Sequence, residues 1–224
     1  IASSGQAIST NIQNEFLAST RAYSTVFGWQ SILYPQGSYS LFNIPLSATE
    51  SIQYVMNSQT GAWCKFTGQN AACWSLFNGN LYFGAQAGGV IYKADSGFSD
   101  NAADIDWKIR PAFSYYGSRG NKKIFSLCRP HFTSSGIPSF AIDLNLDFSN
   151  INPTNIPTPT DTASGIWDVS KWDESYWAEQ VTSAAWTTVF GIGECASPTI
   201  RGGTKTISIS FTAYDMIWQT GSSI

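Results

Sequence analysis

Residues 140–148 read Phe-Ala-Ile-Asp-Leu-Asn-Leu-Asp-Phe, so large apolar residues alternate with one Ala and three polar residues. Successive side chains of a β-strand point to opposite faces of the sheet. Phe140, Ile142, Leu144, Leu146 and Phe148 would therefore line one face, and Ala141, Asp143, Asn145 and Asp147 the other. The stretch predicts a strand with one buried face, as found in antiparallel sheets that pack on a core on one side only.

The segments on either side of this strand repeat the pattern. Residues 105–109 alternate Ile, Trp and Ile with Asp and Lys, and residues 207–212 alternate Ile, Ile and Phe with Ser, Ser and Thr. Further strands are expected over 124–130, 186–192 and 206–218. We interpret residues 101–224 as an antiparallel β-sandwich.

The preceding part of the chain contains shorter strands separated by turn residues. Residues 57–61 end in Gly61, and Asn78-Gly79 is the strongest short hairpin signal, so both predict β-hairpins. Residues 27–100 are therefore expected to form a β-meander or a partial β-propeller. The expected strands are residues 31–34, 38–44, 52–56, 62–66, 71–77, 81–84 and 90–93.

Residues 1–26 form an N-terminal helical segment in this interpretation. Ile8, Ile12 and Phe16 recur at helical spacing, which predicts one short helix over residues 8–22. Ser9 or Thr10 would cap its start, because a side-chain oxygen can accept a hydrogen bond from the first backbone amides. The fold class is then all-β with one short helix.

A long arm, residues 149–184, interrupts the predicted sandwich. Its first half is rich in Pro, and its second half contains Trp167, Trp172 and Trp177 at five-residue steps. Exposed Trp residues are enriched among those that contribute most to binding, so these three are candidates for packing on a neighbouring subunit. The alternative is that they fold back on their own sheet.

Composition excludes several classes of function. Charged residues make up 12% of the chain against an ordinary ~25%, aromatic residues make up 15%, and the net charge is −3. Nucleic-acid binding through phosphate contacts needs many Lys and Arg residues, and no basic cluster exceeds Lys122-Lys123. No apolar run of 18 residues predicts a membrane span. The chain begins at Ile1, so we expect a fragment or a processed chain.

The four cysteines, Cys64, Cys73, Cys128 and Cys195, have no CxxC spacing. A zinc site would need close pairs of ligands, and the one histidine is His131. Buried free thiols in a reducing compartment are the expected state, with disulfides left open.

An acidic run around Gly97 is a weak candidate for calcium. Asp95, Asp100, Asp104 and Asp106 lie within twelve residues, together with Asn101, and calcium takes several oxygen ligands from such loops. The spacing does not match an EF-hand. The alternative is an ordinary turn rich in Asp and Asn.

Catalytic arrangements are not favoured by the sequence. His131 lacks the nucleophile motif of a Ser-His-Asp enzyme. Asp143 and Asp147 would share a strand face, but four residues place them about 13 Å apart, too far for a pair of glycosidase carboxyl groups. Asp168 or Glu179 could supply a partner carboxyl from elsewhere. We therefore expect no enzyme, no catalytic residue and no cofactor.

Several short motifs give the chain a resemblance to a known family. Over most of residues 28–218 it resembles the C-terminal part of the tail nozzle and head-completion proteins of tailed bacteriophages, which stabilise packaged DNA and have a β-propeller-like region. The motifs are Tyr34-Pro35, Asn43-Ile44-Pro45, Tyr54-Val55-Met56-Asn57, Thr60-Gly61-Ala62-Trp63-Cys64-Lys65-Phe66, Leu81-Tyr82-Phe83-Gly84, Gly89-Val90-Ile91-Tyr92, Ala94-Asp95 with Gly97 and Asp100, and Trp167-Asp168 with Trp172-Asp173.

The resemblance implies a structural virion protein of the tail tube, nozzle or head-to-tail connector, made in the host cytoplasm. Its partners would be copies of itself and other virion proteins, with passive passage of DNA. Two alternatives of other classes remain: a carbohydrate- or receptor-binding β module, in which exposed Trp and Tyr stack on sugars, and a glycoside hydrolase. The chain is too short for a whole propeller, at roughly 40–50 residues per blade.

Overall fold

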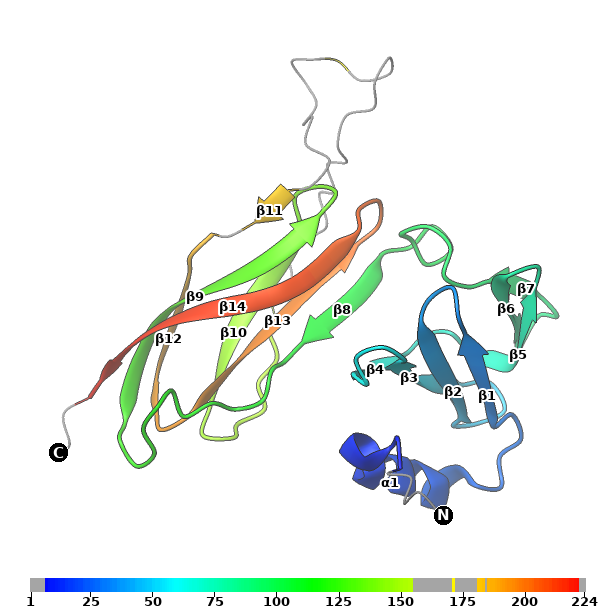
Figure 1. Cartoon of the computed structure of the whole chain (residues 1–224), viewed down its shortest axis with the longest axis horizontal. Coiled ribbons are helices and arrows are strands. Elements are labelled where there is room, and N and C mark those ends of the chain that lie inside the picture. The colour runs from blue at the N-terminus through cyan, green and yellow to red at the C-terminus, as the bar shows by residue number, and fades with distance from the viewer. Residues whose placement is uncertain (1–6, 155–170, 172–180, 184, 222–224) are drawn as a thin grey trace, which may run out of the picture. The chain divides into compact units, whose positions relative to one another are not determined.

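The computed structural model describes residues 7–154, 171, 181–183 and 185–221. The chain divides into two compact units, Ile1–Ser96 and Gly97–Ile224. The predicted all-β class with one short N-terminal helix is confirmed, and the sheets are antiparallel (Figure 1). No helix among the described residues is long and apolar enough to cross a membrane.

The described part of the first unit consists of two successive meanders and a helix. Strands β1 to β4 form one sheet in chain order, and β5 to β7 form a second. Asn78 and Gly79 have positive φ angles of 47° and 76°, as a tight turn between β5 and β6 requires. The elements are a 3-10 turn Thr10–Ile12, α1 Gln13–Tyr23, β1 Gln30–Tyr34, β2 Tyr39–Pro45, β3 Ser51–Asn57, β4 Trp63–Phe66, β5 Ala71–Phe77, β6 Asn80–Ala85 and β7 Ile91–Lys93.

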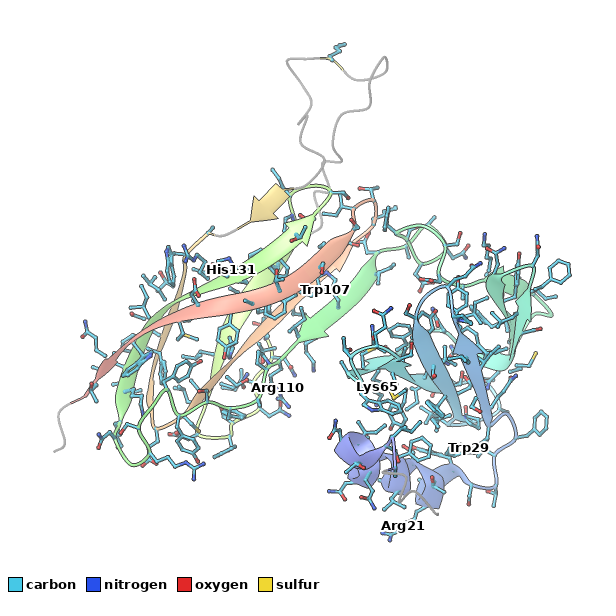
Figure 2. All side chains as sticks on the ribbon, viewed as in Figure 1. Arg21, Trp29, Lys65, Trp107, Arg110 and His131 are labelled. Atoms are coloured by element: carbon cyan, nitrogen blue, oxygen red, sulfur yellow. The ribbon has the colours of Figure 1, made fainter. Side chains whose placement is uncertain are left out.

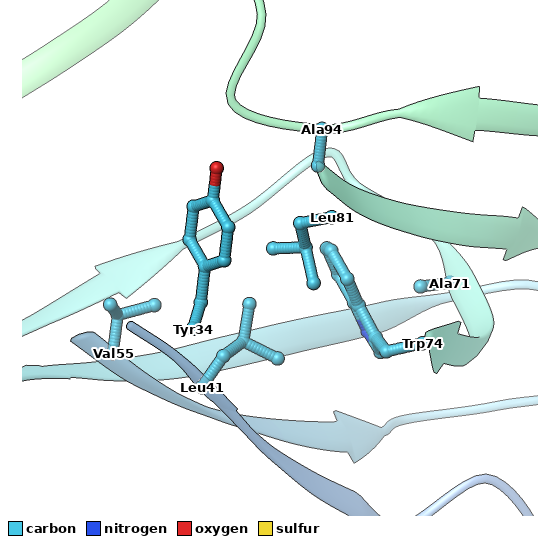
Figure 3. Close-up of a cluster of buried hydrophobic side chains, with 7 residues drawn as sticks. All are labelled: Tyr34, Leu41, Val55, Ala71, Trp74, Leu81 and Ala94. Atoms are coloured by element: carbon cyan, nitrogen blue, oxygen red, sulfur yellow. The ribbon is translucent and has the colours of Figure 1, made fainter. Parts of the chain in front are cut away.

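The central strands of the four-stranded sheet, β2 and β3, are covered on both faces. Ile52 and Tyr54 of β3 pack with Phe16 of α1 on one face. Leu41 of β2 packs on the other face in a cluster shared with β5 and β6, drawn in Figure 3. Because β3 is buried on both sides over its first five residues, its sequence does not alternate as a half-exposed strand would.

A buried polar network joins the two meanders. The Asn43 amide donates to the carbonyl oxygens of Gly28 (2.9 Å) and Ala71 (3.1 Å) and accepts from Trp74 Nε1 (3.1 Å) and Gln53 Nε2 (2.8 Å). Buried polar groups are stable only when they are hydrogen-bonded, so this network specifies how β2 and β3 face β5.

The second unit contains two further antiparallel sheets in its described residues. One has the order β10-β13-β8. In the other, β9 is central, with β14 on one edge and β11 and β12 following one another along the opposite edge. The strands are β8 Ile105–Ile109, β9 Lys123–Ser134, β10 Ser139–Leu146, β11 Val181–Ser183, β12 Thr187–Gly193, β13 Ala196–Thr204 and β14 Ile209–Thr220.

The two sheets of this unit pack face to face, as a sandwich requires. Phe132 of β9 is fully buried and contacts the rings of Trp107 on β8 (centroids 5.6 Å apart) and Phe140 on β10 (5.0 Å). Farther along, Phe125 of β9 and Leu144 of β10 belong to one buried cluster. These contacts across the layers form the core of the unit.

The first residues of the predicted arm are fixed on the sheet of β8, β10 and β13. The Ile151 amide donates to Asn145 Oδ1, and Asn152 Oδ1 accepts from Lys108 Nζ at 3.3 Å. Arg110 donates to Asn150. Since Asn145 lies on β10 and Lys108 on β8, this segment crosses from one edge strand to the other.

Several details of the prediction were wrong. The helix predicted over residues 8–22 begins at Gln13, and β11 lies within the residues predicted as an arm. Strand β10 ends at Leu146, because Asp147 and Phe148 have left-handed φ angles of 47° and 63°. Strand β13 was not predicted. Neither Ser9 nor Thr10 caps α1, since position 12 precedes the helix and no side-chain cap bond forms there.

The expected burial of all four thiols is the last of these errors. All four cysteines are free, but only Cys128 and Cys195 are buried, whereas Cys64 and Cys73 are exposed. Burial raises the pKa of the Cys128 thiol to about 11.

Candidate interaction surface

The outer face of the β12-β9-β14 sheet, directed away from the sandwich core, is apolar over much of its area. Phe190 is 75% exposed, Ile192 54%, and Trp186 and Ile217 each 41%. In register, Ile192 pairs with Ile124, while Leu127 lies opposite Ile217. We call the side chains on this face the outer face: Ile124, Leu127, Trp186, Phe190, Ile192 and Ile217. Contiguous exposed apolar surface of this kind marks contact sites.

Small residues inside the sandwich explain why large apolar ones face outward on β12. Its buried positions are Val189, Gly191 and Gly193, and an added Cβ on Gly191 would overlap Leu146 of the opposite sheet. A residue as large as Phe or Ile does not fit beneath Leu146, so Phe190 and Ile192 take the solvent side. A prediction that buries the larger residues would therefore assign the buried and exposed faces of β12 the wrong way round.

A cluster of polar side chains occupies the same face. Asp215 of β14 lies opposite Arg129 of β9, and its Oδ2 accepts from Arg129 Nε at 3.0 Å. His131 Nε2 lies 2.9 Å from the same oxygen. The Arg129 guanidinium stacks over the Trp186 ring, 4.6 Å from its centroid. Figure 2 shows His131 on β9.

These contacts neutralise the charge of the face internally. Hydrogen bonds from His131 and then from Arg129 lower the pKa of Asp215 below its ordinary value. The carboxylate is therefore ionised and paired with the guanidinium at neutral pH. Docking on this face would not require an unpaired charge to be desolvated.

His131 is thus part of an ion cluster on a sheet surface. Its partners are a carboxylate and, through that carboxylate, an arginine. Nucleophilic catalysis needs the imidazole to activate a hydroxyl or thiol within hydrogen-bond reach. The contacts of His131 instead link β9 to β14.

The two carboxylates considered for glycoside hydrolysis do not share a strand face. Asp147 lies beyond the end of β10, where its Oδ1 accepts from the backbone amides of Glu194 (2.8 Å) and Cys195 (3.2 Å). Asp143 Oδ1 accepts from the amide of Leu144. The Asp147 carboxylate therefore stabilises the turn between β12 and β13.

The calcium candidates are not brought together. Asp95, Asp100, Asp104 and Asp106 form no group of three or more metal-ligating side chains, and the described residues as a whole contain none. Asp100 forms a backbone bridge with Ala103 in a turn.

The remaining predicted site residues, Trp167, Trp172 and Trp177, lie outside the described residues, as do Asp168 and Glu179. The residues of the outer face were not predicted as a site. The signal available was the alternation of Thr188, Phe190 and Ile192 with smaller residues, but sequence alone does not say which set faces solvent.

Two hollows lie in the first unit. One, of about 290 Å³, lies between α1 and β3 and includes Glu15, Tyr54 and Lys65. There Tyr54 Oη lies 2.9 Å from Ser19 Oγ and 3.3 Å from Glu15. These polar groups bind one another and join the helix to the sheet. The other, of about 480 Å³, follows residues 24–30 along Ala72 and Cys73.

The fold and this surface define an all-β protein with two antiparallel units and an apolar, internally charge-paired sheet face. No protein-family model matches the chain. Comparison with curated proteins also finds no match.

Proposed function

We propose that the chain is a non-enzymatic structural component of a tailed-bacteriophage virion, within the tail tube or nozzle or the head-to-tail connector. It would work through contacts with copies of itself and with neighbouring subunits. The outer face is the observation that supports this role most strongly. It exposes Phe190, Ile192 and Ile217 together, and its charged groups are already paired. The motif resemblance supports the viral assignment.

The physical basis of this role is that a surface with few unpaired charges loses little free energy when its water is removed on binding. Protein interfaces are depleted of charge and enriched in aromatic residues in their buried centres, as this chain is in its composition. A subunit repeated around an axis needs such faces to be covered in every copy. A net charge of −3 would also disfavour adhesion of DNA that passes along the axis.

Incorporation into particles tests the proposal. Particles of the virus that encodes the chain would be assembled with the wild-type chain or with the Phe190→Ser/Ile192→Ser variant, and incorporation would be measured by immunolabelling and mass spectrometry. We expect the wild type at the tail or connector and at least a tenfold loss for the variant, with unchanged folding of the free chain.

The Phe77→Ser variant is the matched control. Phe77 is 72% exposed, but it lies at the end of β5 in the first unit. Its incorporation should equal that of the wild type. Absence of the wild-type chain from purified particles would reject the proposal, and equal incorporation of all three chains would remove the role of the outer face.

One observation favours a second candidate, a carbohydrate-binding module. Trp186 is 41% exposed and stacks with Arg129, which in turn pairs with Asp215; small-molecule sites combine aromatic side chains with a few polar groups in this way. A glycan array with the wild type and Trp186→Ala tests it. Binding lost in the variant supports this candidate, and a wild type that binds no glycan excludes it.

A further inference from the structure

Strand β14 has one edge that no described strand covers. Its twelve residues, Ile209–Thr220, pair along one edge with β9. Among the described strands, β9 is the only partner of β14 (Figure 1). An edge of this length presents a row of backbone donors and acceptors that another strand can bind.

Hydrogen bonds at the end of the strand show which backbone groups point outward. The Gly221 amide donates to the Lys122 carbonyl at 2.8 Å, so this pair faces β9. In an antiparallel ladder, residues alternate between facing the partner strand and facing away. The N–H and C=O groups of Thr220 and Trp218 are therefore directed to the uncovered edge.

Strand β14 has few of the features that keep an edge strand from pairing with another chain. Natural edges use Lys, Pro, bulges or short length to prevent pairing. Strand β14 contains neither Lys nor Pro, and Asp215 is its one charged residue. The pairing of β14 with β9 has two bulges. The first inserts Thr212 into β14, whereas the second inserts Ser126 into β9 and leaves β14 regular. The edge is thus continuous from Ala213 to Thr220.

We propose that the uncovered edge of β14 binds β14 of a second copy of this chain, in antiparallel orientation about a twofold axis. An antiparallel edge is self-complementary under such an axis, because each outward donor meets an outward acceptor of the other copy. Asp215 does not oppose the contact, since Arg129 pairs with its charge within each copy.

This inference rests on the proposed structural role and names the surface that joins identical copies. Pairing would extend β12-β9-β14 into one continuous sheet across the axis. The outer faces of the two copies would then form a single larger apolar surface, available to other subunits. Backbone hydrogen bonds would supply the affinity, as in other strand-addition interfaces.

Matched lysine variants test the edge against the rest of the sheet. Ala213→Lys/Gln219→Lys places two charges on β14, and Ala185→Lys/Thr188→Lys places two at the start of β12 on the opposite edge; all four positions are exposed and none belongs to the outer face. Light scattering over a concentration series of the full chain gives the dimer dissociation constant. We expect a rise of about tenfold for the β14 variant, from like charges across the axis, and no change for the β12 variant.

Amide hydrogen exchange of the wild type provides the second readout. Protection of Trp218 and Thr220 should increase with protein concentration in step with dimerisation. Protection of these amides in samples that light scattering shows to be monomeric would mean that the chain itself covers the edge, and the proposal would be rejected.

The remaining outcomes separate this inference from the proposed function. Self-association that both variants leave intact, with unprotected β14 amides, overturns the β14 contact but not a structural role in particles. A strict monomer at all concentrations also overturns it. Absence from particles, by contrast, rejects the proposed function whatever the behaviour of β14.

Discussion

The ammonium group of Lys123 is fully buried at the start of β9 and is held by backbone oxygens alone among its described contacts. It donates to the carbonyl oxygens of Ser118, Asn121 (3.0 Å) and Glu194 (3.0 Å). A buried charge is tolerated when hydrogen bonds replace its water. This one residue therefore fastens the loop before β9 to the turn between β12 and β13.

Replacing Lys123 by Met should destabilise the second unit strongly. The apolar stem is kept, but three carbonyl oxygens lose the donor that pairs with them, so we expect a loss of about 3 kcal/mol. Urea unfolding, followed by hydrogen exchange in β9, measures it. Lys122→Met, at the exposed neighbouring position, should stay within about 0.5 kcal/mol; equal effects of the two variants would contradict the role of the buried cation.

The lowered pKa of Asp215 makes the cross-strand cluster dependent on pH. A carboxylate with a depressed folded pKa stabilises the fold above its unfolded pKa of ~3.9. That stabilisation is lost as the pH falls through the lower folded value. The melting temperature of the wild type should therefore exceed that of Asp215→Asn at pH 7, and the difference should shrink below pH ~4. A constant difference across this range would show that the charge of Asp215 is not the cause.

At the scale of the strand, two glycines stand where a Cβ would meet a neighbour, Gly202 within its own sheet and Gly191 against the opposite sheet. A Cβ on Gly202 of β13 would lie 2.5 Å from the Ser139 carbonyl oxygen and 2.6 Å from the Trp107 ring. The neighbour of Gly191 on β12 is instead the flexible end of the Leu146 side chain. Backbone cannot move aside as a methyl group can.

Alanine at the two positions should therefore have unequal effects. Gly202→Ala should cost about 3 kcal/mol and Gly191→Ala about 1 kcal/mol, because overpacking is relieved more easily by a side chain. Calorimetric melting of the full chain, with hydrogen exchange to identify the second unit, gives both values. The reverse order would mean that β8 and β10 move aside from β13 more readily than the contacts of Gly202 suggest.

The strand scale also shows how far the sequence predicts this fold. Alternation or turn residues located most strands, including β5 at the bounds observed, because local signals agreed with burial. Strand β13 was not predicted because it contains Pro198, Gly202 and Gly203, and both residue types are depleted in strands. Its place is determined by partners on both sides, β10 and β8, which no local pattern reveals.

The same limit applies to the candidate surface. Composition suggested a protein built for contacts, but the predicted site residues were the three tryptophans of the arm. The outer face depends on which side of β12 the opposite sheet occupies, and Leu146 decides this from a distant part of the sequence. The Asp215 pairing likewise depends on the register of β14 against β9. Tertiary contacts of this kind cannot be inferred from periodicity.

At the scale of the whole molecule, the two units have separate cores. The cluster that contains Leu41 and Trp74 lies within Ile1–Ser96, and the cluster of Phe125 and Leu144 lies within Gly97–Ile224. A domain is stable by itself when its own buried residues are sufficient. The separate cores imply that the first unit can lose its packing while the second keeps it.

Leu41→Ala tests this independence in the full chain. Leu41 is 1% exposed between the two meanders, so the cavity should cost the first unit about 2–5 kcal/mol. Hydrogen exchange should then accelerate in β2 and β3 but not in β9. Leu33→Ala is the matched control, because Leu33 is 56% exposed on the adjacent strand β1, and it should change neither unit by more than about 0.5 kcal/mol. Faster exchange in β9 of the Leu41 variant would show that the two units unfold as one cooperative body.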